Sequence, residues 1–230
     1  MNISIINHIQ PTTSQPMKRK YYPTLENTTN NHFDISPEAV ELTKEIPISQ
    51  RLVSCFVTSP IDGADNNGDL LRLGELLNAR SPHVEALRTE PSFIEKKRIE
   101  DDLPIFTPCC VLRYDFTARK YYPINYTCIL DFDIMKDDNP TIDFEELRRD
   151  LSALPQTYYC GLATNGIDLF CIVPISAPQR YEEHAAALVR LFRQQGVNIR
   201  IAEEVTHARK ISTDPSGYFN ENPKEFTMFC

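Results

Sequence analysis

The dipeptide Asn165-Gly166 lies between two apolar runs and constrains the fold more than any other short stretch of the chain. Residues 157–164 and 168–175 carry the aromatic and β-branched side chains that are typical of strands. Both residues of the dipeptide accept positive φ angles, as a tight hairpin turn requires. The sequence therefore predicts two antiparallel strands joined at this point.

The rest of the chain alternates further strands with helices. Strands are predicted over residues 52–57, 105–114 and 125–133, with shorter ones over 197–201 and 209–213. Helices are predicted from Asp69 to about Ala79, over residues 91–101, behind the capping box Asp143/Glu146, and over the apolar stripe from Tyr181 to Phe192. This order favours an α+β domain with one mainly antiparallel central sheet and flanking helices.

Two carboxylates, Asp131 and Asp133, follow an apolar run that ends at Leu130. Residues two apart on a strand share a face, so both side chains point the same way. Neighbouring carboxylates repel each other, and a hard divalent cation such as Mg²⁺ suits oxygen ligands. The pair therefore indicates a metal site, although solvated carboxylates at a strand end explain it as well.

Charge and cysteine content limit the class of protein. A net charge of -8 argues against a chain coated in basic residues for duplex DNA, while a local basic groove remains compatible with it. The seven Cys residues include no C-x-x-C spacing, and no signal peptide is evident, which favours reduced core thiols in a cytoplasmic protein. No apolar run approaches the roughly 20 residues that a membrane span needs.

Residues 1–48 are rich in Asn, Thr, Pro and Ser and are expected to form a flexible leader, with one domain over 49–230. The leader holds Arg19-Lys20-Tyr21-Tyr22-Pro23, which recurs at residues 119–123. Cations beside aromatic rings suit single-stranded nucleic acid, so Arg119 and Lys120 are candidate binding residues. The alternative is that the second copy is only a hairpin connection and the first a coincidence.

A second basic cluster precedes a turn near the end of the chain. His207, Arg209 and Lys210 come shortly before Asp214, which begins the turn sequence Asp-Pro-Ser-Gly. Such a cluster would suit a phosphate-bearing ligand, and a surface strand with a turn fits these residues equally well. The sequence assigns no partner to His207 for acid–base chemistry.

The stretch from about Arg51 to Phe226 resembles the VirE-type N-terminal domain, which precedes helicase regions in primase–helicase proteins of phages and mobile elements. That domain is similar to the RRM-like catalytic core of archaeo-eukaryotic primases. The resemblance rests on four elements in order: Leu103-Pro104, Leu130-Asp131-Phe132-Asp133, the Asn165-Gly166 hairpin closing on Val173-Pro174-Ile175, and Ala208 to Pro215.

The resemblance implies a chemistry. Asp131 and Asp133 match the family's D-x-D, which holds Mg²⁺ or Mn²⁺. In the family these metals bind the nucleotide triphosphate and activate the attacking 3′ hydroxyl. Asp214 matches the family's turn aspartate, and Arg209 remains from its basic run. Nucleotide or single-stranded nucleic acid is the implied ligand. A helicase, encoded separately or lost by truncation, is the implied partner.

Two positions depart from the family's pattern. Phe170 stands where the hairpin should carry a basic residue, and Asp168 replaces a Gly. Residues 197–200 read Val-Asn-Ile-Arg where a third acidic residue is expected, although Glu203 or Glu204 would substitute in a shifted register. Each loss removes roughly 3 kcal/mol of transition-state stabilisation. The leading hypothesis is a primase-like domain that is weakened or inactive as a polymerase.

Two other hypotheses stay open at this point. The chain would be an accessory or interaction protein that retains only the fold, or an active primase–polymerase whose missing ligands come from other positions. A third carboxylate beside Asp131, Asp133 and Arg209 would favour the enzyme. A pocket filled by Phe170 would argue against catalysis.

Overall fold

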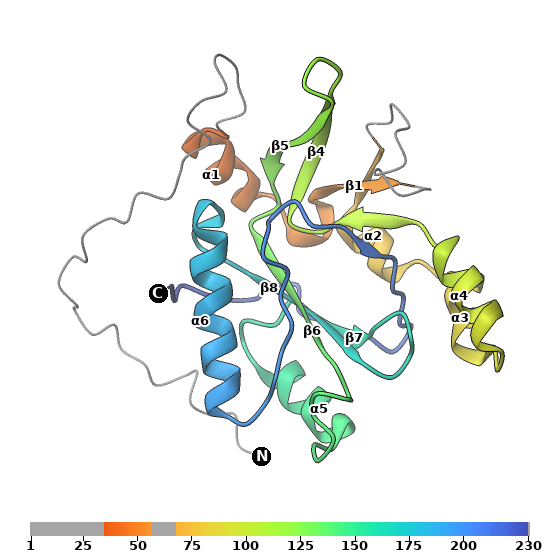
Figure 1. Cartoon of the computed structure of the whole chain (residues 1–230). Coiled ribbons are helices and arrows are strands. Elements are labelled where there is room, and N and C mark those ends of the chain that lie inside the picture. The colour runs from red at the N-terminus through yellow and green to blue at the C-terminus, as the bar shows by residue number, and fades with distance from the viewer. Residues whose placement is uncertain (1–34, 57–67, 230) are drawn as a thin grey trace.

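The computed structural model describes residues 35–56 and 68–229, which form an α+β protein with mostly antiparallel sheets (Figure 1). The helices are α1 (Pro37–Glu45), α2 (Leu73–Asn78), α3 (Pro82–Thr89), α4 (Phe93–Asp101), α5 (Phe144–Ala153) and α6 (Tyr181–Gln194), with 3-10 turns η2 (Ile48–Gln50) and η4 (Pro178–Arg180). The strands are β1 (Leu52–Phe56), β2 (Asp69–Arg72), β3 (Ile105–Thr107), β4 (Cys110–Asp115), β5 (Lys120–Tyr126), β6 (Ile129–Ile134), β7 (Tyr159–Leu162), β8 (Leu169–Pro174), β9 (Arg209–Lys210) and β10 (Tyr218–Phe219).

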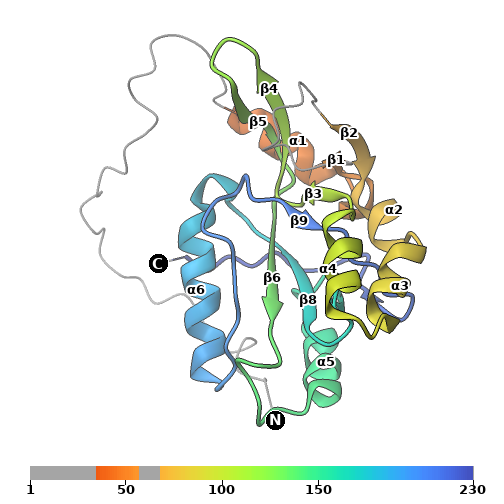
Figure 2. The same cartoon turned by 45° about the vertical axis from the view of Figure 1, so that its right-hand side comes forward.

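The strands form two sheets and a ribbon rather than the single central sheet predicted from the sequence. One four-stranded sheet has the order β2-β1-β3-β9, the other has the order β10-β7-β8-β6, and β4 pairs with β5 alone. All of these pairings are antiparallel. Figure 2 shows β9 beside β3, close to the start of β6, so the two sheets meet there.

Two breaks in the predicted strands explain the division. The strand predicted over residues 105–114 is interrupted by a turn at Pro108-Cys109, and the one predicted over 125–133 is interrupted at Cys128, whose φ is 54°. A non-glycine residue rarely adopts this left-handed conformation. Thr127 joins the two breaks, because its hydroxyl donates to the Pro108 carbonyl at 2.6 Å and its amide to the Cys109 carbonyl at 3.0 Å.

The hairpin predicted at Asn165-Gly166 is confirmed. Strands β7 and β8 pair antiparallel on either side of it, and Gly166 takes a φ of 74°. Asn165 contributes differently from the prediction, since its φ is not positive. Its side-chain oxygen instead accepts the amides of Ile167 and Asp168, both at 3.0 Å, which is the Asx-turn chemistry of asparagine.

Helices α5 and α6 also begin and pack as their sequence patterns predict. The Asp143 carboxylate caps α5 by accepting the amides of Glu145 and Glu146 at 2.9 and 3.1 Å. Phe192 of α6 packs on Phe132 of β6, with ring centroids 5.2 Å apart. Because side chains alternate along a strand, this contact leaves Asp131 and Asp133 on the opposite face of β6 from α6.

The helix predicted from Asp69 to Ala79 is only partly present. Residues 69–72 form β2, which pairs with β1 from Cys55↔Asp69 to Leu52↔Arg72. Helix α2 begins only at Leu73, so Asp69 caps no helix, and α3 follows where no helix was predicted. The leucine spacing favours a helix from residue 69, but pairing with β1 holds residues 69–72 as a strand instead.

The end of the predicted leader docks on the domain. Helix α1 is capped by Ser36, and its Thr43 hydroxyl contacts the Asn125 side chain of β5 at 3.2 Å. Lys44 donates to the Ser176 carbonyl at 2.7 Å. The first copy of the Arg-Lys-Tyr-Tyr-Pro repeat lies outside the described residues. Within the described ranges, every helix is too short or too polar to cross a bilayer.

Candidate functional site around Asp131 and Asp133

Strand β6 carries the two aspartates to the junction of the sheets. Asp131 is opposite Ile172 of β8, and Asp133 is opposite Phe170. Asp131 is 3% exposed, whereas the Asp133 side chain is 33% exposed. A buried carboxylate is costly unless it is paired, so its partners determine what this site does.

Arg209 of β9 supplies the positive charge between the two carboxylates. Its Nη1 donates to Oδ2 of Asp131 at 2.9 Å, and its Nη2 donates to Oδ1 of Asp133 at 2.8 Å. The guanidinium lies over the Phe170 ring, 3.5 Å from the centroid, which is a cation–π contact. Phe170, at the position where the resemblance implies a basic residue, therefore packs its ring against the Arg209 guanidinium.

The segment 197–200, where a third acidic residue is expected, carries none: its nearest oxygen donor, Asn198, is neutral, and its side-chain amide nitrogen donates to the Asp138 carbonyl at 3.0 Å. Asp133 and Arg200 form an isolated antiparallel bridge, with reciprocal backbone hydrogen bonds of 2.9 and 2.8 Å. The Arg200 guanidinium turns to Asp138, at 2.6 and 2.9 Å. The Glu204 carboxylate bonds Thr206 instead. Among the described residues, no set of three carboxylates meets at this site.

These contacts do not fit a site for two oxygen-ligated metals. Mg²⁺ and Mn²⁺ require carboxylate oxygens that are free to ligate. Here Asp131 and Asp133 already accept charge-assisted hydrogen bonds from Arg209. The prediction that they bind Mg²⁺ or Mn²⁺ therefore requires Arg209 to move first, and it stays a prediction.

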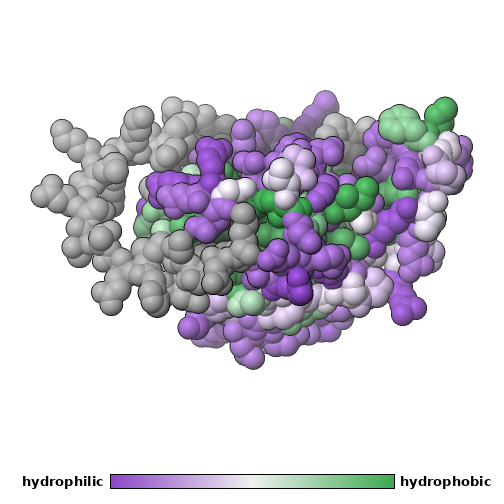
Figure 3. Space-filling view, turned by 90° about the horizontal axis from the view of Figure 1, so that it is seen from below, coloured by the Kyte–Doolittle hydropathy of each residue, from purple (hydrophilic) through white to green (hydrophobic). Residues whose placement is uncertain are grey.

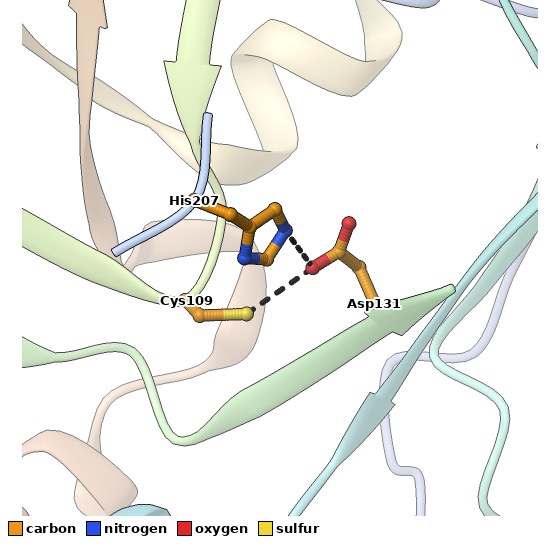
Figure 4. Close-up of side chains that lie close together, drawn as sticks. All are labelled: Cys109, Asp131 and His207. Carbon is orange, nitrogen blue, oxygen red and sulfur yellow. Dashed lines mark hydrogen bonds and ion pairs between the residues drawn. The ribbon is translucent and has the colours of Figure 1, made fainter. Parts of the chain in front are cut away.

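The other oxygen of Asp131 meets two further side chains, shown in Figure 4. His207 Nε2 lies 2.8 Å from Oδ1, and the Cys109 thiol donates to the same oxygen at 3.2 Å. Cys109 belongs to the turn between β3 and β4, whereas His207 belongs to the loop before β9. Asp131 thus brings together three segments that are distant in sequence.

Burial and charge act in opposite directions on this cluster. Burial alone raises the pKa of Asp131, but His207 and Arg209 outweigh it and hold that pKa well below 3.8. Burial likewise lowers the pKa of His207, yet Asp131 and the Glu204 carbonyl raise it above 6.5. Burial and Asp131 raise the pKa of the Cys109 thiol well above 9.0. Both ring nitrogens of His207 face oxygen atoms, Nδ1 at 2.9 Å from the Glu204 carbonyl and Nε2 at 2.8 Å from Asp131, so the geometry favours an imidazolium beside the Asp131 carboxylate.

Two of the residues singled out from the sequence, Lys210 as a candidate phosphate contact and Asp214 as the turn aspartate, lie outside this cluster. Lys210 donates to the carbonyls of Asp101 and Leu103, at 3.0 and 3.3 Å, and so binds the end of α4. Asp214 accepts from Arg148 at 2.9 Å and does not contact the cluster. Sequence reasoning also missed Cys109, because a single cysteine in an apolar turn carries no ligand spacing.

Arg119 and Lys120 form a separate basic tip on the β4–β5 hairpin, which projects from the body of the protein in Figure 1. Arg119 takes a φ of 53° in the turn. The Asp115 carboxylate holds this turn by accepting the amides of Thr117 and Ala118 at 2.7 and 3.0 Å. Beside the tip, the Tyr114 ring lies 5.2 Å from that of Phe116, which is exposed.

Comparisons with protein-family models, with curated proteins and with solved structures found no match to this chain. The interpretation of the site therefore rests on its own geometry.

Proposed function

We propose that this chain is a primase-like domain of a phage or mobile element that binds single-stranded nucleic acid or nucleotide and does not polymerise. The observation that carries the proposal is the bridge from Arg209 to both Asp131 and Asp133, seated on Phe170. The two sequence motifs of the resemblance, on β6 and β9, lie side by side through this bridge. Their proximity supports the primase-core assignment.

The loss of catalysis follows from electrostatics. Two-metal phosphoryl transfer depends on divalent cations that stabilise the attacking and leaving oxygens. A guanidinium between the carboxylates contributes one fixed positive charge and no open coordination position. The segment 197–200, where the resemblance implies a third acidic residue, carries none, and the Arg200 guanidinium pairs with Asp138 instead. Each missing element costs roughly 10²-fold in rate or more.

The β4–β5 hairpin is the proposed contact for nucleic acid. Arg113, Arg119 and Lys120 are exposed there, beside the paired rings of Tyr114 and Phe116. Phosphates meet such cations while bases stack on such rings. In a chain of net charge -8, a basic tip is a local exception that suits a polyanion.

The binding half of the proposal is tested by fluorescence anisotropy with labelled single-stranded oligonucleotides. The variant Arg119→Glu/Lys120→Glu is expected to bind at least about tenfold more weakly, with a salt slope reduced by about 1.4 for two lost phosphate contacts. The charge-matched control is Arg190→Glu/Arg193→Glu, on exposed positions of α6. Equal affinity of the two double variants would contradict the proposal.

The catalytic half is tested by primer synthesis with Mn²⁺ or Mg²⁺ and nucleotides on a single-stranded template. The wild-type protein should yield no more product than Asp131→Asn/Asp133→Asn. Metal-dependent nucleotide binding should be equally absent from both proteins. Product above the level of the double variant would overturn the assignment and restore the active-polymerase hypothesis.

An accessory or interaction protein is the second candidate, favoured by the exposed side chains of α4. Phe93 and Ile94 are 82% and 76% exposed. Figure 3 shows a mostly hydrophilic face with hydrophobic side chains at its right-hand edge, the side on which Figure 1 draws α3 and α4. Such patches mark contacts with other proteins. Analytical sedimentation tests this candidate. It would be favoured if the wild type self-associates but binds no nucleic acid, and if Phe93→Ser/Ile94→Ser abolishes the self-association.

A further inference from the structure

Three donor atoms of different chemistry converge on one point beside β6. Cys109 Sγ, a carboxylate oxygen of Asp131 and a ring nitrogen of His207 all lie within 4.8 Å of one another. Figure 4 shows the three side chains pointing toward a common centre from a turn, a strand and a loop. Sulfur, nitrogen and oxygen together are the ligand set of zinc and related transition metals, and not of Mg²⁺.

The orientation of His207 is the one that metal-ligating histidines adopt. Its Nδ1 lies 2.9 Å from the Glu204 carbonyl oxygen, which only accepts, so Nδ1 carries a proton. Nε2 is thereby the nitrogen aimed at Asp131. Metal-ligating histidines commonly donate one ring N–H to a backbone carbonyl, and this hydrogen bond orients the other nitrogen toward the metal.

A fourth polar atom, the hydroxyl oxygen of Tyr181, lies beside the cluster. The Tyr181 side chain, at the start of α6, is 4% exposed, and its hydroxyl has no hydrogen-bond partner among the described residues. Burial raises the pKa of this hydroxyl, and the neighbouring Cys109 and Asp131 raise it further. Its ring centroid is 6.4 Å from that of His207. The hydroxyls of Tyr158 and Tyr159 also lack a partner within the part of the chain that the structure describes. What makes Tyr181 a candidate fourth ligand is therefore its place beside Cys109 and Asp131.

We propose that Cys109, Asp131 and His207 bind one divalent transition metal of the zinc class, with the Tyr181 hydroxyl or a water molecule as the fourth ligand. Tetrahedral zinc holds such donors about 3.3–3.5 Å apart, given bonds of 2.0–2.3 Å. The present separations are 2.8 Å for His207 Nε2 and 3.2 Å for Cys109 Sγ, each measured to Asp131 Oδ1. These two pairs therefore need to separate by about half an ångström or less, and the sulfur and the imidazole nitrogen already lie within 4.8 Å of each other.

The exchange balances in charge. Without metal, the cluster contains the anionic Asp131 and Asp133, the cationic His207 and Arg209, and the neutral thiol of Cys109. Coordination forms metal–sulfur, metal–nitrogen and metal–oxygen bonds and releases the thiol proton and the imidazolium Nε2 proton. Two positive charges replace two protons, so the net charge of the buried cluster is unchanged. Arg209 retains Oδ2 of Asp131 throughout, since the metal uses Oδ1.

The test titrates Co²⁺ into the full chain after treatment with a chelator, because tetrahedral cobalt–thiolate sites absorb strongly. One Co²⁺ per chain should produce a thiolate-to-cobalt charge-transfer band, which Zn²⁺ displaces and a large excess of Mg²⁺ does not. Cys109→Ser should lose the band. Cys110→Ser is the matched control, since that adjacent buried thiol bonds the Val205 carbonyl outside the cluster.

A second variant separates ligation from misfolding. His207→Gln should keep the charge-transfer band only at much higher Co²⁺, with an affinity reduced by more than about 100-fold. Urea midpoints measured without metal show whether each variant is folded. Zn²⁺ should raise the midpoint of wild type and Cys110→Ser but not of Cys109→Ser. Absence of the band in the wild type, or an equal band in Cys109→Ser, would overturn the site; nucleic-acid binding at the β4–β5 tip is independent of either result.

Discussion

Asp131 and Asp214 are both buried carboxylates paired with an arginine, yet their surroundings differ in kind. Asp214 is 5% exposed and accepts from Arg148 and from the Leu162 amide, each at 2.9 Å. The Ser216 amide and hydroxyl complete its shell, at 2.9 and 2.8 Å. The Asp131 carboxylate, by contrast, is held by the side chains of Cys109, His207 and Arg209.

This difference indicates a structural role for Asp214 and a role in ligand or proton exchange for Asp131. Backbone amides cannot titrate or leave, so Asp214 holds the turn before β10 against β7. Side chains can lose protons, move or yield to a metal. Asp214 is therefore held by partners that stay in place, whereas the partners of Asp131 can lose protons or be displaced. Three measurements test this contrast.

The largest effect is expected from Arg209→Met. Removing the guanidinium leaves Asp131 buried and Asp133 beside it without their shared cation, which should lower the free energy of unfolding by about 3–5 kcal/mol. Urea unfolding at neutral pH measures this loss. Asp131→Asn/Asp133→Asn added to Arg209→Met should recover part of it. A loss below about 1 kcal/mol would show that the cluster does not depend on its cation.

Asp214→Ala should cost less, because its removal leaves unpaired groups but no unpaired carboxylate. The Leu162 amide and the partly buried Arg148 lose their acceptor, which should lower the free energy of unfolding by about 1–3 kcal/mol. Asp137→Ala, on an exposed residue, is the control and should change little. A larger loss for Asp214→Ala than for Arg209→Met would reverse the comparison.

The smallest effect concerns pH. The pKa of His207 is raised above 6.5 in the folded state, so its contribution to stability is complete below pH 6.5 and is lost as the pH rises through the folded value. The pKa of Asp131 is lowered, so its contribution is complete above 3.8 and is lost on acidification.

His207→Gln should therefore flatten the alkaline decline in unfolding free energy above pH 6.5. His83→Gln, on an exposed position of α3, serves as the control. The measurement is the urea midpoint from pH 5 to 9, without added metal. An unchanged alkaline slope in His207→Gln would show that the imidazolium does not stabilise Asp131.

The predictions that succeeded from sequence were local ones. The Asn165-Gly166 turn, the cap of α5 at Asp143 and the shared face of Asp131 and Asp133 all depend on residues within a few positions of each other. The helix predicted from Asp69 failed because β1 pairs with residues 69–72. The prediction of a single sheet was wrong because Cys128 interrupts residues 125–133, which the side-chain pattern predicts as one continuous strand.

By itself, the sequence determined that two carboxylates share a strand face, since alternation along a strand is a property of the backbone. Only the tertiary structure decided what those carboxylates meet. Cys109 and Arg209 are 22 and 78 positions from Asp131, and periodicity carries no information at such separations. Their convergence depends on how the two sheets meet, and this meeting is what places an arginine, a histidine and a thiol around the two carboxylates.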